Sequence, residues 1–251
     1  MKLRSLLTSL ALLVFISSQA QAPKTLTVDE ILTKYFAATG GIDKWKALKS
    51  RTAVGKAMFG PGQEFPMTVY EAAPNKQKTI VNVQGTELML NCYDGKDAWM
   101  LNPLQGGKDP VKLDDEAAKD IKDEDFEDDF LDYKKKGHEA TLEGTEEVDG
   151  VKCYKVKLVK NKNNPKDDST EIHFFDAENF VPIVVTSYIK AGPMKGTEIK
   201  NYLSDYQEVN GLMFPFSMEQ KMNGQTAAKI TLEKITLNDV KDESIFAFPK
   251  K

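Results

Sequence analysis

The sequence predicts a mainly β protein in which one antiparallel sheet follows two short α-helices. Three observations support this fold class. From Thr52 onward, apolar and polar residues alternate in short runs, as in strands that bury one face. Glycine, proline and asparagine residues separate these runs and are typical of tight turns between antiparallel neighbours. Before Thr52 the apolar residues instead recur every three to four positions, as on one face of a helix.

We expect residues 1–22 to be a signal peptide. Lys2 and Arg4 precede an apolar run, and Ala20-Gln21-Ala22 supplies the small residues that a signal peptidase recognises. The run is too short to cross a hydrocarbon core of about 30 Å, which argues against the alternative of an uncleaved membrane anchor. Because no cysteine lies near the cleavage site, a lipid-modified N-terminus is not expected. Residues 23–251 would then be the exported protein.

The charge and length of the chain narrow its class. It has 34 basic and 38 acidic side chains and a net charge of −4. Because no basic stripe is visible, nucleic acid is not an expected partner. A chain of 251 residues can bury one substantial core, and neither an internal repeat nor a linker-like break divides it. We therefore expect residues 23–251 to form a single domain.

Two helices are expected before the first strand. The first begins at Thr27, which with Glu30 fits a capping box, and it ends at Gly40-Gly41. Its apolar face is made of Ile31, Leu32, Tyr35 and Phe36. The second, shorter helix carries Ile42, Trp45 and Leu48 on one side.

The strands fall into two groups separated by a charged interruption. They are expected at residues 52–59, 65–73, 77–83, 86–93 and 97–101, and then at 139–147, 152–159, 169–176, 182–190, 195–203, 212–221 and 225–237. In the last strand the apolar series Ile230, Leu232 changes phase to Ile235, Leu237, which predicts a β-bulge near Glu233-Lys234. Residues 160–168 are polar and are expected to form a loop.

The interruption, residues 114–136, is rich in carboxylates with apolar residues among them. The step from Ile121 to Phe126 breaks helical spacing, so two short helices are expected rather than one. Residues 123–129 lack the glycine and ligand register of an EF-hand, so we favour a solvated helical face over a calcium site. The apolar side of this stretch could serve as a lid.

Cys92 and Cys153 are the two cysteines. In an oxidising compartment they could pair, provided that their Cα atoms lie about 4.4–6.8 Å apart. Alternatively, each is buried as a small apolar residue. A metal site made from these two residues alone is not expected, and we expect both to be dispensable for folding.

Three phrases in the second half of the chain resemble a known family. The first runs from Leu142 to Leu158 and joins two strands at an Asp149-Gly150 turn; the others are residues 174–182 and 206–216. Together they resemble the periplasmic lipoprotein carrier and sorting proteins of the LolA/LolB type. This resemblance implies one strongly curved antiparallel sheet, a half-barrel whose concave side is covered by α-helices. It also implies a monomeric periplasmic carrier whose partners are lipoprotein acyl chains or another lipid, and envelope membrane proteins.

A carrier of this kind must shield acyl chains from water. Burying about 14 methylenes at ~0.8 kcal/mol each is worth on the order of 11 kcal/mol, so an apolar cavity is required. Flexible methionine and bulky aromatic residues suit such a cavity, although ordinary core packing explains each of them equally well. The candidate lipid-binding residues are Met89, Trp99, Met100, Phe126, Phe130, Tyr188, Met213, Phe216 and Met218.

Arg51 is the only arginine beyond the expected signal peptide. Lid-holding arginines are a feature of the family, and a five-donor guanidinium could hold backbone carbonyls of a lid. The alternative is a solvated cation at the C-terminal end of a helix.

Catalytic signals are weak. His138 and His173 are the only histidines, and the sequence contains no His-Glu-x-x-His, Gly-x-Ser-x-Gly or phosphate-binding glycine motif. We therefore expect neither an enzyme nor a cofactor. An envelope assembly or scaffold module with the same fold and no ligand is the alternative to a carrier, and a hydrolase is the third possibility.

Overall fold

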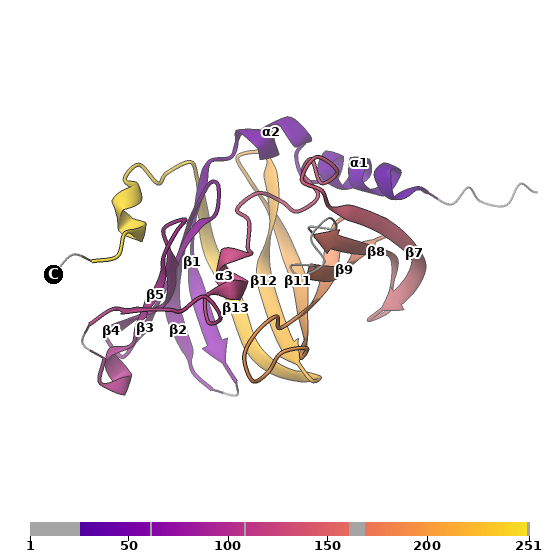
Figure 1. Ribbon diagram of the computed structural model, residues 1–251. Helices are drawn as coiled ribbons and strands as arrows, with labels where there is room; N and C mark the ends of the chain where they lie inside the picture. Colours follow the sequence, from indigo (N-terminus) through magenta and orange to yellow (C-terminus); the bar gives the residue numbers. More distant parts are fainter. Residues whose placement is uncertain (1–25, 61, 108, 161–168, 250–251) are drawn as a thin grey trace, which may run out of the picture.

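The computed structural model describes residues 26–60, 62–107, 109–160 and 169–249 of the chain (Figure 1). The expected signal peptide and residues 161–168 of the expected polar loop lie outside these ranges. Within them, no helix is both long enough and apolar enough to cross a membrane.

The two N-terminal helices form as predicted. Helix α1 (Val28–Ala38) starts with a capping box, in which the Glu30 amide donates to Thr27 Oγ1 at 3.2 Å and the Thr27 amide donates to Glu30 Oε2 at 2.8 Å. Helix α2 (Ile42–Ala47) follows directly. Its expected apolar side is partly in solvent, since Ile42 is 41% exposed.

The helices are followed by strands that form one antiparallel sheet of 13 strands within the described residues, in the order β6-β5-β4-β3-β2-β1-β13-β12-β11-β10-β9-β8-β7. The first group of strands is β1 (Ser50–Phe59), β2 (Glu64–Ala72), β3 (Lys76–Val83), β4 (Thr86–Tyr93), β5 (Ala98–Leu101) and β6 (Val111–Lys112). The second is β7 (Glu139–Val148), β8 (Val151–Lys160), β9 (Ser169–Asp176), β10 (Pro182–Tyr188), β11 (Glu198–Val209), β12 (Leu212–Met222) and β13 (Gln225–Leu237). Strands β6 and β7 end the sheet, so it is not closed into a barrel.

The predicted bulge in the last strand is confirmed. In the pairing of β1 with β13, Val54 lies opposite Lys234 and Gly55 lies opposite Leu232, so Glu233 is the extra residue. At this point the strands approach closely, and a Cβ on Gly55 would lie 2.2 Å from the Thr231 carbonyl oxygen. Glycine is therefore required opposite the bulge.

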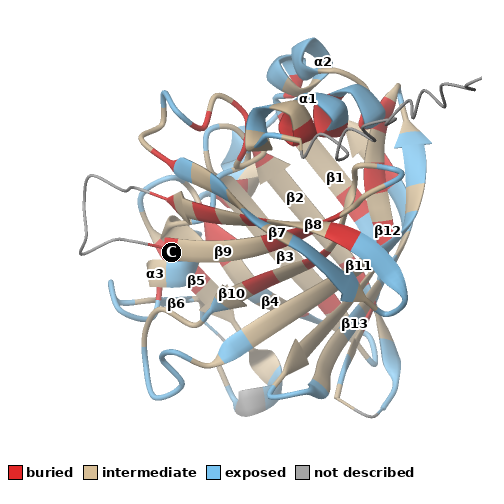
Figure 2. Cartoon of the chain, turned by 90° about the vertical axis from the view of Figure 1, so that its right-hand side faces the viewer, coloured by how far each residue is buried: buried red, intermediate tan, exposed pale blue. Residues whose placement is uncertain are grey.

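The sheet bends, so that β7–β9 cross in front of β1–β4 in Figure 2. Residues 114–138, here called the inner segment, run between these two flanks (Figure 1). The expectation of two short helices in this stretch is wrong, because only α3 (Lys119–Lys122) is α-helical and residues after it form turns. One such turn is fixed by Asp128, whose Oδ1 accepts from the Phe130 amide at 2.9 Å.

Apolar clusters lie on both faces of the sheet. On the inner face, α1 and the inner segment pack against β8 and β9 through Tyr35, Phe130 and Phe175. On the opposite face, residues 240–248, here called the C-terminal cover, include the 3₁₀-helix η2 (Glu243–Phe246) and pack on β2–β5. Figure 1 shows the inner segment and η2 on opposite sides of β1–β5.

Candidate ligand site on the inner face of the sheet

A cavity of about 200 Å³, here called the apolar trough, lies against the middle of the sheet on its inner face. Alternation within β1, β2, β12 and β13 directs apolar side chains to this face. Its apolar lining is Ala53, Met67, Val69, Leu203, Phe214, Pro215, Phe216, Met218, Ile230, Leu232 and Ile235. The predicted residues Phe216 and Met218 therefore face a cavity. Charged side chains line this cavity at one end only.

Arg51 and Glu71 form that charged end. Arg51 Nε and Nη2 donate to the two carboxylate oxygens of Glu71 at 2.6 and 2.8 Å, and the guanidinium lies 5.5 Å from the centre of the Phe214 ring. Burial acts to lower the pKa of Arg51, but the Glu71 carboxylate outweighs it, so the pKa is raised. These bonds join β1 to β2. Among the described residues, Arg51 therefore binds a carboxylate of the sheet, and not the backbone carbonyls of a lid that the family resemblance implies.

A second cavity of about 260 Å³, the polar chamber, adjoins the trough. Both are lined by Arg51, Glu71, Leu203, Phe214 and Pro215, so the two cavities lie side by side and share a wall. The inner segment forms one wall of the chamber through residues 124–130, and Tyr35, Trp45, His173 and Tyr206 contribute from α1, α2 and the sheet.

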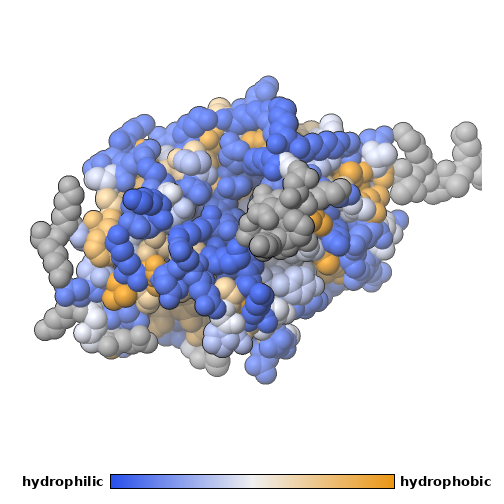
Figure 3. All heavy atoms as spheres, viewed as in Figure 1, coloured by the Kyte–Doolittle hydropathy of each residue, from blue (hydrophilic) through white to orange (hydrophobic). Residues whose placement is uncertain are grey.

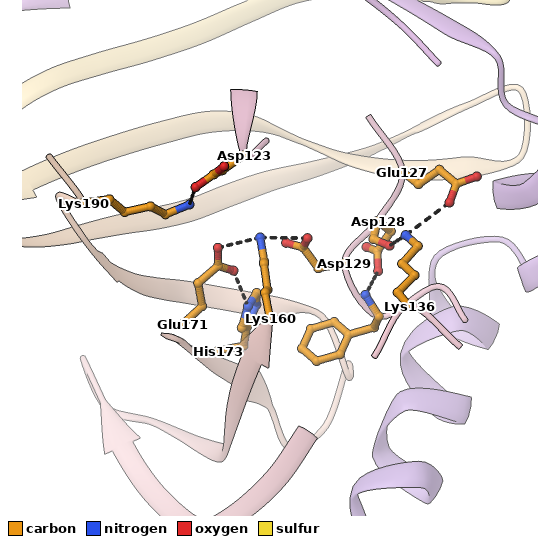
Figure 4. A network of polar contacts seen from close by, with 10 residues as sticks. Asp123, Glu127, Asp128, Asp129, Lys136, Lys160, Glu171, His173 and Lys190 are labelled. Carbon is orange, nitrogen blue, oxygen red and sulfur yellow. Dashed lines mark hydrogen bonds and ion pairs between the residues drawn. The ribbon is translucent and has the colours of Figure 1, made fainter. Parts of the chain in front are cut away.

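The inner segment meets the opposite flank through buried charges (Figure 4). Lys160 Nζ on β8 lies 2.8 Å from Asp129 Oδ1 of the segment and 2.7 Å from Glu171 Oε1 on β9. His173 Nε2 lies 3.0 Å from the second oxygen of Glu171. Because Lys160 is only 9% exposed, this group is shielded from water, and the expectation of a solvated acidic face is wrong here.

Burial changes the acidity of these groups. It raises the pKa of Asp129 to about 6, against the lowering effect of Lys160. It opposes ionisation of Glu171 too, but hydrogen bonding to His173 and the charge of Lys160 prevail and lower that pKa to about 2. Burial also raises the pKa of Asp128, although the Tyr35 hydroxyl donates to its Oδ2 at 2.5 Å. The inner segment thus carries carboxyl groups that hold protons more tightly than in water.

A third cavity of about 410 Å³, the charged chamber, lies beyond this group of residues. Lys160 and Glu171 line it, together with Tyr188 and with Lys190, whose Nζ lies 3.4 Å from Asp123 Oδ2. Figure 3 shows that the surface on the side where Figure 1 shows the inner segment is mostly hydrophilic.

The structure brings six of the nine predicted lipid-binding residues to these cavities. Phe216 and Met218 line the trough; Phe126, Phe130 and Met213 line the polar chamber; Tyr188, 40% exposed, lines the charged chamber.

The other three predicted residues lie elsewhere. Trp99 and Met89 face the opposite side of the sheet and pack with the C-terminal cover, where Trp99 Nε1 donates to the Phe246 carbonyl at 3.3 Å. Met100 is half-buried beside the sheet edge and lies opposite Val111 on β6. Alternation alone gives two faces, and only the C-terminal cover reveals that Trp99 belongs to the outer one.

The sequence did not identify Lys160 or the β13 residues Ile230, Leu232 and Ile235 as part of the site. Ile230, Leu232 and Ile235 were recognised as an apolar series, and the bulge that shifts them keeps Ile235 on the inner face. Lys160 had no distinguishing signal, because it stands among many lysines at the start of a polar stretch.

Metal and thiol chemistry find little support. In the described ranges, no group of three or more His, Cys, Asp or Glu side chains is arranged to hold a metal ion. Cys92 and Cys153 are free, buried and in separate clusters. Burial raises the pKa of Cys92 to about 12 and that of Cys153 to about 11, so both are poor nucleophiles.

Comparison with known proteins defines the class. The chain has the fold of the LolA superfamily: a LolA superfamily protein from Nitrosomonas europaea has a TM-score of 0.55 at 14% identity, over 89% of this chain and 98% of that chain. A domain described as an outer membrane lipoprotein-sorting protein, from Vibrio parahaemolyticus, has a TM-score of 0.56 at 13% identity, over 86% and 94%. A DUF1329 family protein from Desulfovibrio piger has 0.55 at 14%, over 86% and 97%.

The family of the chain follows from a second comparison. A family model described only as "Uncharacterized protein" matches residues 77–248, which is more than half of the chain, and the chain belongs to that family. No curated protein matches it in sequence. The predicted resemblance to the LolA type is confirmed, and at 13–14% identity the chain is divergent from these structures.

Proposed function

We propose that this protein is a periplasmic lipid carrier, which holds a lipoprotein acyl chain or another lipid in the apolar trough for outer-membrane sorting. In this proposal the bent sheet is a half-barrel, and the inner segment is its lid. The observation that carries the proposal is the trough itself, an apolar cavity on the inner face of an open sheet whose fold is shared with a lipoprotein-sorting domain.

The energetics favour an acyl ligand at this place. Each methylene moved from water into the trough contributes about 0.8 kcal/mol. The lining is aliphatic and aromatic, while the nearest charges, Arg51 and Glu71, neutralise each other at one end. A chain in the trough would therefore meet no unpaired charge.

The trough is small for a ligand site, so the binding of a long acyl chain requires it to enlarge. Sites for small molecules commonly have about 300–1,000 Å³, and the trough has about 200 Å³. Room for a longer chain lies in the polar chamber, into which the inner segment projects Phe126 and Phe130. Binding therefore requires these two rings to move aside.

The same observation favours the alternative function of a ligand-free scaffold module. Phe126 packs with the cluster of Phe214 and Phe216, and Phe130 packs with Tyr35 and Phe175. If the inner segment is a permanent part of the core, the fold is kept without a ligand. The two proposals differ in whether the folded protein takes up lipid.

Three substitutions at neighbouring positions of β12 test the proposal. Phe216→Asp and Met218→Asp each place a carboxylate in the trough, whereas Ser217→Asp places one on the outer face of the same strand. We expect wild type and Ser217→Asp to bind a fluorescent fatty-acyl probe at micromolar concentration, and the other two to bind at least about tenfold more weakly. Mass spectrometry of co-purifying lipid would identify the ligand class. Absence of probe binding to the folded wild type would favour the scaffold.

A further inference from the structure

The inner segment presents five carboxylates to the polar chamber, of which Asp128 and Asp129 are partly buried. The polar chamber is lined by Glu124, Asp125, Glu127, Asp128 and Asp129 of this segment. Of these, Glu127 has an ion-pair partner in Lys136 of the same segment, at 3.1 Å. Such a contact within the segment does not hold it against the sheet.

Lys160 is different, because it joins the segment to the sheet from a buried position. Its ammonium group lies within 2.8 Å of Asp129 and of Glu171, so one cation faces two carboxylates on two elements. A further titratable group beside it is His173, which also contacts Glu171, and the charge of Lys160 also acts on Glu124 and His138. Without the lysine, Asp129 and Glu171 would face each other in a site poor in water, which is costly for like charges.

The ion pair between Lys160 and Asp129 is linked to the apolar trough through the neighbours of Asp129 in the chain. Asp129 is three residues after Phe126, which packs with the trough residues Phe214 and Phe216, and next to Phe130, which packs under α1. A segment released at Asp129 would withdraw both rings. The trough and the polar chamber would then form one larger cavity.

We propose that Lys160 is the counter-ion on which seating of the inner segment depends, and that neutralising it opens the apolar trough. The effect of Lys160 on the position of the inner segment does not depend on lipid. Only its consequence, that the opened trough admits lipid, rests on the proposed function. Lys160 acts here as a positioning residue through Asp129.

Hydrogen exchange of the full-length mature protein, without lipid, tests the mechanism. Lys160→Met should accelerate exchange in peptides covering residues 119–133 by about tenfold or more, because an unpaired buried carboxylate disfavours the closed arrangement. The Phe126 amide, which donates to the Pro74 carbonyl at 3.1 Å, is a direct reporter of attachment. Exchange in β12 and β13 should stay slow, which also shows that the variant is folded.

Three variants make the result specific. Lys155→Met removes the same charge from the same strand, but Lys155 pairs with Glu143 and Glu146 of β7, so the inner segment should be unaffected. Lys160→Arg should keep slow exchange because the cation remains. The double variant Lys160→Met with Asp129→Asn should restore slow exchange because the orphaned carboxylate is gone.

Acyl-probe binding separates this proposal from the lipid function. Faster exchange together with faster probe uptake in Lys160→Met supports both. Faster exchange with no probe binding in any variant supports the counter-ion and overturns the carrier. Unchanged exchange in Lys160→Met, equal acceleration in Lys155→Met, or failure of Asp129→Asn to restore protection would each overturn the counter-ion proposal.

Discussion

Two segments cover the sheet, one on each face, and they are held by different forces. The C-terminal cover packs Phe246, fully buried, and Phe248 against Trp99 and Cys92. The inner segment also inserts aromatic rings, but it brings partly buried carboxylates with them, and a charged carboxylate such as Asp129 needs a counter-ion there, which Lys160 supplies. The stability gained by burying apolar side chains does not depend on pH. The stability of a buried charge depends on whether its partner is present and charged. If Lys160 seats the inner segment as we propose, the cover on the outer face is permanent and the one on the inner face is releasable.

The largest expected effect concerns the permanent cover. Phe246→Ala should lower the free energy of unfolding by about 3–5 kcal/mol, because it removes a fully buried ring and leaves a cavity beside Trp99. Phe248→Ala, at a partly buried ring on the same cover, is the matched control and should cost clearly less. Urea denaturation of both variants measures the difference. Equal and small losses would show that the C-terminal cover is not part of the fixed core.

A smaller effect on stability, which depends on pH, should distinguish the inner segment from the C-terminal cover. The pKa of Asp129 is about 6 in the folded protein, above the ordinary aspartate value of 3.8, so the folded state takes up the proton more readily. The contribution of this group to stability is therefore complete below pH 3.8 and is lost as pH rises through 6. Relative to Asp129→Asn, the wild type should gain on the order of 1 kcal/mol between pH 7 and pH 5.

Denaturation of the wild type and Asp129→Asn at pH 5, 6 and 7 measures this difference. Asn is a neutral stand-in for the protonated acid, so the variant should be at least as stable as the wild type at pH 7. Parallel pH profiles for the two proteins would contradict a raised pKa of Asp129 and, with it, the conditional character of the inner segment.

The smallest effect is expected at the cysteines, of which Cys92 packs with the C-terminal cover and Cys153 lies in a separate cluster with Phe174 and Val184. Cys92→Ser with Cys153→Ser should cost less than the roughly 2–5 kcal/mol typical of a lost disulfide, because both thiols are free. Native protein should resist alkylation at pH 8 because both pKa values are near 11 or 12, and it should react at both sites once unfolded. Rapid alkylation of the native protein would show that these clusters open readily.

Regular elements could be predicted from the sequence because their signals are local. The capping box of Thr27 and Glu30 fixes the start of α1, and the phase change after Leu232 locates the bulge at Glu233. Most strands follow from alternation and turns in the same way, although β6 was not expected and β11 (Glu198–Val209) extends past the expected end at residue 203. None of these signals requires knowledge of which elements meet in space.

The inner segment and the site could be predicted only in part, because they depend on long-range contacts. Asp129 looks like a solvent residue until Lys160 is placed beside it, 31 positions later. Trp99 looks like a cavity residue until the C-terminal cover is seen to bury it. Phe216 and Met218 could be assigned to one face because alternation in an uninterrupted strand gives a face, and here that face lines the trough.

The two tryptophans of the chain allow the most direct test of the central claim, that lipid occupies the inner face. Trp45 lines the polar chamber, whereas Trp99 lies beneath the C-terminal cover on the other face. A brominated fatty acid quenches tryptophan fluorescence on contact, so the variants Trp99→Phe and Trp45→Phe each report one face. We predict saturable quenching in Trp99→Phe, which keeps Trp45, and none in Trp45→Phe. Equal quenching in both, or quenching in neither, would contradict a lipid site between the sheet and the inner segment.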